Sequence, residues 1–172
     1  MRLLVRAACA VLCIAAVISA AASAHFAAAA TAPRCATAAL VVWLNTEGAD
    51  HAAGSSYYKL AFTNLSGHAC TLQGFPGVSA ADITGRLLGR AAARSHAGTA
   101  RQIRLANNAT AVALLQIANA HNFPRSSCGP VVAAALRVYP PSQTASKVVP
   151  FPFPACSRSG PVFLLVRAVQ KA

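Results

Sequence analysis

The amino-acid sequence predicts an all-β fold: a disulfide-stapled, antiparallel β-sandwich of the Ig-like type that follows an N-terminal signal peptide. Short apolar runs are separated by turn residues such as glycine, proline and asparagine. No segment keeps the spacing of a long amphipathic helix. Residues 57–64 alternate between apolar and other side chains, as a half-buried strand does. Many short strands without long helices are typical of a sandwich.

Residues 1–24 have the layout of a secretory signal peptide. Arg2 and Arg6 supply the positive start, and residues 7–22 form an almost wholly apolar run. Ala22-Ser23-Ala24 then gives the small-x-small cleavage pattern. Because the apolar run is shorter than the ~20 residues that span a bilayer, we expect cleavage and no transmembrane segment afterwards. A retained anchor is the alternative.

The rest of the chain divides into a flexible, alanine-rich lead at residues 25–34 and a single domain at residues 35–169. Each expected strand is an apolar or alternating run with turn residues at its ends. The expected strands are residues 38–44, 57–64, 69–73, 78–83, 102–105, 110–118, 131–139, 148–149 and 162–169. Loops are expected at residues 46–56, 86–101 and 119–127. The single tryptophan, Trp43, is expected in the core.

Four cysteines remain after the signal peptide: Cys35, Cys70, Cys128 and Cys156. An even number in an exported chain indicates two disulfides. Three pairings are possible, and we favour Cys35–Cys70 with Cys128–Cys156, because each closes a loop of moderate length between neighbouring segments. A metal site fits less well, since zinc ligands usually come in close pairs such as CxxC.

Basic residues far outnumber acidic ones. Without Arg2 and Arg6, 13 of the 15 basic residues remain against three acidic ones, a formal net charge of +10. So few carboxylates argue against chemistry that needs paired acids. A basic stretch contains the candidate residues for binding an anionic surface: Arg86, Arg90, Arg94, Arg101 and Arg104.

This charge indicates contact with anionic cell-wall polymers or lipid head groups, and the alternative is a solvated surface that maintains solubility. Nucleic acid is not an expected partner, because an exported protein rarely meets it and basic residues do not interleave with aromatic ones here.

Catalytic and metal-binding motifs are not apparent. The histidines fall in the tail or in expected loops, without ligand spacing: His25, His51, His68, His96 and His121. The sequence lacks a Gly-x-Ser-x-Gly nucleophile motif. We therefore expect no catalytic residue, no metal and no cofactor. Asn64 is interpreted as a turn-bonding residue rather than a glycosylation site, and residues 74–77 as a rigid turn rather than a ligand loop.

Several motifs in the middle of the chain follow one another with a recognisable spacing. They are Phe62-Thr63-Asn64, Cys70-Thr71-Leu72, Gly74-Phe75-Pro76-Gly77-Val78, Asp82 and Gly85. With Cys128-Gly129-Pro130 and Cys156, they resemble a secreted bacterial family, found mainly in actinobacteria and catalogued as domain of unknown function 4232. The resemblance covers about residues 35–169 and implies export and a disulfide-bonded β-sandwich, but no established activity. The family typically has Pro-Gly before the strand at 110–118, where this chain has Asn107-Asn108, which keeps a turn.

The function that these observations favour is that of an exported envelope or extracellular domain, a non-catalytic binding or structural module that contacts anionic envelope components. One alternative is a secreted protein–protein interaction domain that uses a sheet face or edge. Another is a hydrolase with an unrecognised loop site, in which a histidine would meet a serine or a carboxylate.

Overall fold

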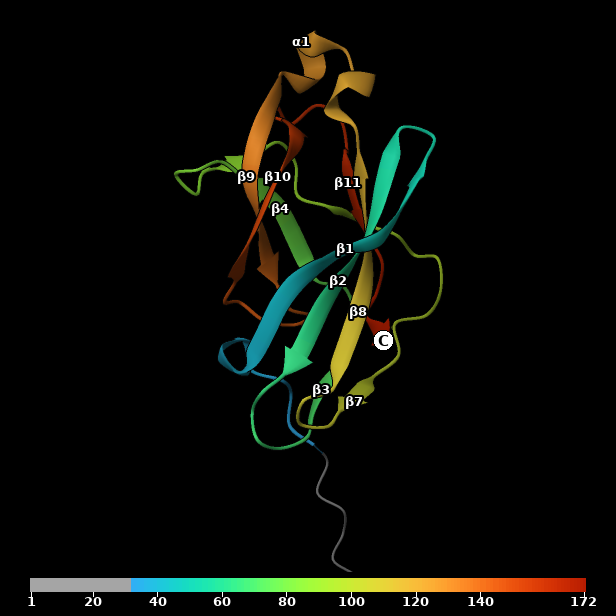
Figure 1. The fold of residues 1–172 in the computed structure, drawn as a ribbon, viewed down its shortest axis with the longest axis vertical. Coiled ribbons are helices and arrows are strands. Elements are labelled where there is room, and N and C mark those ends of the chain that lie inside the picture. Colours follow the sequence, from blue (N-terminus) through green and yellow to red (C-terminus); the bar gives the residue numbers. More distant parts are fainter. Residues whose placement is uncertain (1–31) are drawn as a thin grey trace, which may run out of the picture. The chain divides into compact units, whose positions relative to one another are not determined.

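A computed structural model describes residues 32–172 of the protein (Figure 1). The expected signal peptide and most of the expected flexible lead lie outside the described residues. Within them the chain forms twelve strands and three short helical turns. The helical turns are η1 (Thr37–Ala39), η2 (Ala120–Asn122) and α1 (Arg125–Cys128). The all-β prediction is confirmed, whereas the Ig-like assignment stays a prediction.

The larger sheet has the strand order β1-β2-β8-β11-β6, and β12 also pairs with β8. Its neighbours are antiparallel except for β11 and β6, which are parallel. In Figure 1, β1, β2 and β8 run together through the lower half of the picture. The bounds are β1 Leu40–Ala52, β2 Ser55–Asn64, β6 Ala93–Arg94, β8 Thr110–Ala118, β11 Leu164–Val166 and β12 Gln170–Lys171.

A second sheet has the order β10-β9-β4-β5, and β3 pairs with β7 as a separate two-stranded unit. These pairs are all antiparallel. The bounds are β3 Cys70–Leu72, β4 Gly77–Ala81, β5 Leu87–Leu88, β7 Ile103–Leu105, β9 Pro130–Tyr139 and β10 Lys147–Cys156.

Side chains from all three sheets meet in one hydrophobic core. Leu60 and Phe62 of β2 and Leu115 of β8 are fully buried, and Leu136 of β9 packs into the same cluster. The alternation that predicted the strand at 57–64 therefore marks its inner face. Since one cluster joins the two larger sheets, they form the two layers that a sandwich requires.

The disulfide prediction is confirmed. Cys35 bonds to Cys70, and Cys128 bonds to Cys156. The first disulfide ties the segment before η1 to β3, and the second ties the end of α1 to the end of β10. Disulfides persist in oxidising compartments, so both bonds indicate a chain that folds outside the cytoplasm.

Two predictions near the start of the domain are wrong. Residues 46–56 are mostly strand, because β1 and β2 continue as a long hairpin up to the turn at Ala53 and Gly54. The hairpin end is exposed on both faces, so it carries no alternation of apolar residues. Trp43 lies on the outer face of β1 with 42% of its surface exposed, not in the core.

The strand expected at 148–149 is in fact the ten-residue β10. Pro150, Pro152 and Pro154 do not end it, since β10 is the edge strand of its sheet and its outer side needs no hydrogen-bond donors. Other differences are smaller. Residues 86–101 contain β5 and β6, residues 119–127 contain η2 and part of α1, and residues 162–169 are strand only at β11.

The Asn64 side chain joins three segments at one end of the domain. It is fully buried, and its amide nitrogen donates to the carbonyl oxygens of His68 (2.8 Å), Ala106 (3.0 Å) and Leu105 (3.2 Å). Its Oδ1 accepts from the Ser66 backbone N–H at 3.0 Å, which confirms the turn-bonding interpretation. Every polar atom of this side chain is therefore used to hold backbone.

We expect Asn64→Ala to lower the free energy of unfolding by about 2–4 kcal/mol, because it leaves buried carbonyls and an N–H without partners. Asn107→Ala is the matched control. Its Oδ1 accepts only from the exposed Gly67 N–H, so its effect should stay below about 1 kcal/mol. Urea denaturation of the disulfide-bonded proteins measures both values. Equal losses in the two variants would contradict a special role for Asn64.

Candidate anion-binding site

The five arginines predicted to bind an anionic surface do not form one cluster. Their side chains are all exposed, but they belong to different parts of the fold. Arg86 lies in the turn between β4 and β5, Arg90 follows β5 and Arg94 ends β6, whereas Arg101 precedes β7 and Arg104 lies within it. Each must therefore be judged by its own surroundings.

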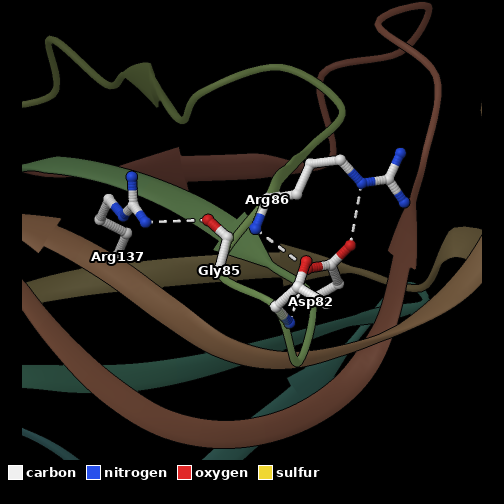
Figure 2. A network of polar contacts seen from close by, with 5 residues as sticks. Asp82, Gly85, Arg86 and Arg137 are labelled. Carbon is white, nitrogen blue, oxygen red and sulfur yellow. Dashed lines mark hydrogen bonds and ion pairs between the residues drawn. The ribbon is translucent and has the colours of Figure 1, made fainter.

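Arg86 is held by an acid (Figure 2). Its Nε donates to Asp82 Oδ2 at 3.0 Å, and its backbone N–H donates to Asp82 Oδ1 at 2.9 Å. The Thr84 hydroxyl and backbone N–H also donate to Oδ1, at 2.7 and 3.0 Å. On the neighbouring strand β9, Arg137 reaches across to donate to the Gly85 carbonyl at 2.8 Å. Arg86 is thus part of a tied turn and its charge is already balanced.

The same turn holds the Asp82 carboxylate in its ionised form. The hydrogen bond from the Thr84 hydroxyl lowers the pKa of Asp82 most, desolvation opposes it, and bonds from Arg86 and the backbone add to the lowering. The pKa of Asp82 falls from 3.8 to about 2. Such a shift reflects preferential bonding to the charged form.

Arg94 stands over the ring of Phe75, with 5.8 Å from the guanidinium carbon to the ring centroid. His96 meets the same ring edge-on, with centroids 5.4 Å apart. Both side chains cover the turn at residues 74–77, in which Gly74 has a positive φ of 102° and accepts at its carbonyl from Val169. These contacts support the interpretation of this segment as a rigid turn.

Arg104 lies on the same surface as Arg34, a residue predicted to belong to the flexible lead. Thr71 of β3 pairs with Arg104 on one side and forms a parallel bridge with Arg34 on the other. Paired residues point to the same face of a sheet, so both arginines flank Thr71 on its outer face. Two strand spacings place their backbones about 10 Å apart.

A small pocket opens beside Arg34. Its volume is about 80 Å³, which accommodates a small group such as a phosphate. Its lining residues are Arg34, Thr71, Gln73, Gln102, Pro141 and Ser142. None of them is acidic. They offer a guanidinium, two amides and the Ser142 hydroxyl, since the Thr71 hydroxyl already donates to the Pro33 carbonyl at 3.2 Å. We call the surface made by Arg34, Thr71, Gln73, Gln102 and Arg104 the Arg34–Arg104 face.

This face has the donor set that an oxyanion requires. A guanidinium can bind two oxygens of a phosphate or carboxylate at once, and neutral amides and hydroxyls can satisfy the others. Arg34, Gln73 and Gln102 were not among the binding residues predicted from the sequence. One signal was available: Arg34 adjoins Cys35, and the predicted bond from Cys35 to Cys70 already implied that Arg34 lies close to residues 69–71.

Other groups of reactive side chains lack the partners that a catalytic or metal site requires. His51 Nδ1 and Ser56 Oγ lie 2.9 Å apart as a cross-strand pair on the exposed β1–β2 hairpin. They line an open pocket of about 310 Å³ whose lining contains no carboxylate to orient the histidine. Among residues 32–172, no three histidine, cysteine, aspartate or glutamate side chains gather as metal ligands would. In the same part of the chain, no helix is long and apolar enough to cross a membrane.

We expect NMR titration of the Asp82 carboxyl group to give a midpoint of about 2. Because the folded pKa lies below the unfolded value, the stability contributed by Asp82 is complete above pH ~4 and is lost as the pH falls toward 2. Thr84→Val should move the midpoint up toward 3.8, since the hydroxyl bond is the largest cause. Thr99→Val, in an exposed loop, should leave it unchanged. A wild-type midpoint near 3.8 would contradict this account.

Comparison with known protein families matches residues 35–168 to the family described as domain of unknown function (DUF4232). No curated protein and no solved structure shows a significant match to the chain. The match covers both disulfides, the Asp82 turn and all of the Arg34–Arg104 face except Arg34 itself. The chain therefore belongs to the DUF4232 family.

Proposed function

We propose that this protein is a non-catalytic binding module of the cell envelope, and that its Arg34–Arg104 face contacts anionic envelope components. The main support for this proposal is that Arg34 and Arg104 lie on either side of Thr71. The two guanidinium groups raise the positive potential on both sides of Thr71, and no acid lines the adjoining pocket. A bound oxyanion would balance this charge and use the donors that the pocket presents.

The rest of the chain supports an anionic partner of the same kind. The acidic residues are Glu47, Asp50 and Asp82, and the last of these already binds Arg86. A net charge of +10 after residue 24 would draw the protein toward a negative polymer or surface over several ångströms. The arginine pair would then select phosphate or carboxylate groups by direct hydrogen bonding.

Anionic wall polymers and anionic lipids share this chemistry, and the sheet geometry favours the polymer. Arg104 lies in β7 and Arg34 in an isolated bridge, and the adjoining pocket is lined mainly by polar side chains, which do not insert among lipid chains. A polymer of repeated phosphates could instead pass along the face and place successive groups at the two arginines.

The interaction-domain alternative has less support from the second sheet. Val132 and Val148 are exposed there, at 72% and 61%. However, the edge strand β10 has prolines at 150, 152 and 154, which remove N–H donors that a strand from a partner would need. Arg137 also lies beside Val148 in the register of this sheet, so the apolar area is interrupted by charge.

We expect Arg34→Gln/Arg104→Gln to weaken binding to a poly(glycerol phosphate) chain by about tenfold or more at low salt, because each lost charge-assisted bond contributes roughly 1.5–3 kcal/mol. Arg90→Gln/Arg125→Gln removes the same charge from other exposed sites, and it should cost at most about threefold. Calorimetry with the disulfide-bonded proteins measures both, and salt should weaken the wild-type interaction.

Two outcomes would overturn the proposal. Equal losses in the two double variants would mean that only net charge matters. Binding to vesicles of an anionic lipid, but not to the polymer, would show that lipid head groups are the partner and that the polymer assignment is wrong.

A further inference from the structure

A second, chemically different site lies on the outer face of the larger sheet, where a groove of about 350 Å³ crosses β1, β2, β8 and β12. We call it the Trp43 groove. Seven of its lining residues carry the argument: Trp43, Asn45, Lys59, Ala61, Val112, Gln170 and Lys171.

The strand register builds the groove. Trp43 pairs with Ala61, Ala61 pairs with Val112, and Val112 pairs with Gln170, so four residues stand in one row on one face. The row has larger side chains at its ends and smaller ones between them. Ala61 and Val112 lie on the outer face but are only 2% and 8% exposed, because longer side chains around them shield them from solvent. They form a floor, and Trp43 and Gln170 form the walls.

The indole ring of Trp43 lines this groove and is fixed in place by a hydrogen bond. Its indole Nε1 donates to Thr63 Oγ1 at 3.3 Å, and Thr63 is itself hydrogen-bonded to Thr110 at 2.9 Å. The ring is thus anchored by its polar edge while 42% of the residue stays exposed. A large aromatic side chain with a fixed orientation is a ready stacking surface for a ligand.

Polar groups surround this surface. Lys59 and Lys171 line the groove, and neither forms an ion pair within residues 32–172. Asn45 lies opposite Lys59 in the register, and its Oδ1 already accepts from the Glu47 N–H at 2.9 Å, which leaves its amide N–H groups available. Gln170 supplies a second amide. The groove combines one flat apolar surface with amide and ammonium donors.

We propose that the Trp43 groove binds a glycan that carries carboxylate groups. A sugar ring has a face of C–H groups, which stacks on an aromatic ring, and a rim of hydroxyls, which bond to amides. The two lysines would pair with the acid groups. An apolar peptide or an acyl chain would instead leave these donors without partners when it covered them, which is unfavourable. This site uses none of the residues of the Arg34–Arg104 face and does not depend on the function proposed for it.

The single tryptophan makes the test direct, since all indole fluorescence comes from Trp43. A short oligogalacturonate should change that fluorescence saturably, and its methyl ester, which lacks the charge, should bind at least about threefold more weakly. Lys59→Gln should reduce binding of the acidic oligomer and leave binding of the ester within about twofold. Arg34→Gln/Arg104→Gln should not alter either result, which separates this site from the proposed anion-binding face.

Calorimetry tests the role of the ring itself. Trp43→Ala should weaken binding by about tenfold or more, whereas Trp43→Phe, which keeps an aromatic face, should retain binding within about fivefold. Val41→Ala is the matched control, because Val41 is 46% exposed on the same face of β1 but does not line the groove. Unchanged affinity in Trp43→Ala, equal binding of acid and ester, or tighter binding of a single-stranded oligonucleotide would each overturn the proposal.

Discussion

The hydrogen bonds of the buried Asn64 side chain are the interaction on which one end of the domain depends, the end at which β2 stops and β3 pairs with β7. At this residue β2 ends, the turn toward β3 begins, and the carbonyls at the end of β7 are bound. By holding these segments together, one side chain supports the pairing of β3 with β7. A buried polar group of this kind is stable only when all its hydrogen bonds form, so it favours one arrangement over alternatives.

The Arg34–Arg104 face follows from that constraint together with the first disulfide. The β3–β7 pairing places Arg104 beside Thr71, and the Cys35–Cys70 bond holds the preceding residue, Arg34, on the other side. Two arginines separated by 70 positions along the chain thus lie on either side of one residue, Thr71. The core-facing residues Cys70 and Leu105, one position away in each strand, bind the same segment to the interior.

The basic residues differ in whether their charged groups are already engaged by neighbouring side chains or carbonyls. Arg86 is paired with Asp82, Arg94 stands over Phe75, and Arg137 donates to the Gly85 carbonyl. These three stabilise local structure. The chain also has many alanines, and one of them, Ala61, creates the floor of the Trp43 groove by being smaller than its neighbours. Both candidate sites therefore follow from the strand register. In the first, the register places an arginine on each side of Thr71, and in the second it places small side chains between larger ones in one row.

The sequence by itself determined the local features of this protein. β8 occupies the predicted residues 110–118, the alternation in β2 marks its inner face, and the two cysteine pairs could be inferred from even number and loop length. Each of these depends on residues that are close in the chain or on a pattern with a fixed period. Tertiary structure decided that Trp43 faces outward and that β10 continues through three prolines. It also decided that Arg34 and Arg104 lie on either side of Thr71. Those outcomes depend on which strands become neighbours and in which register, and pairing between distant segments leaves no periodic signal in either of them.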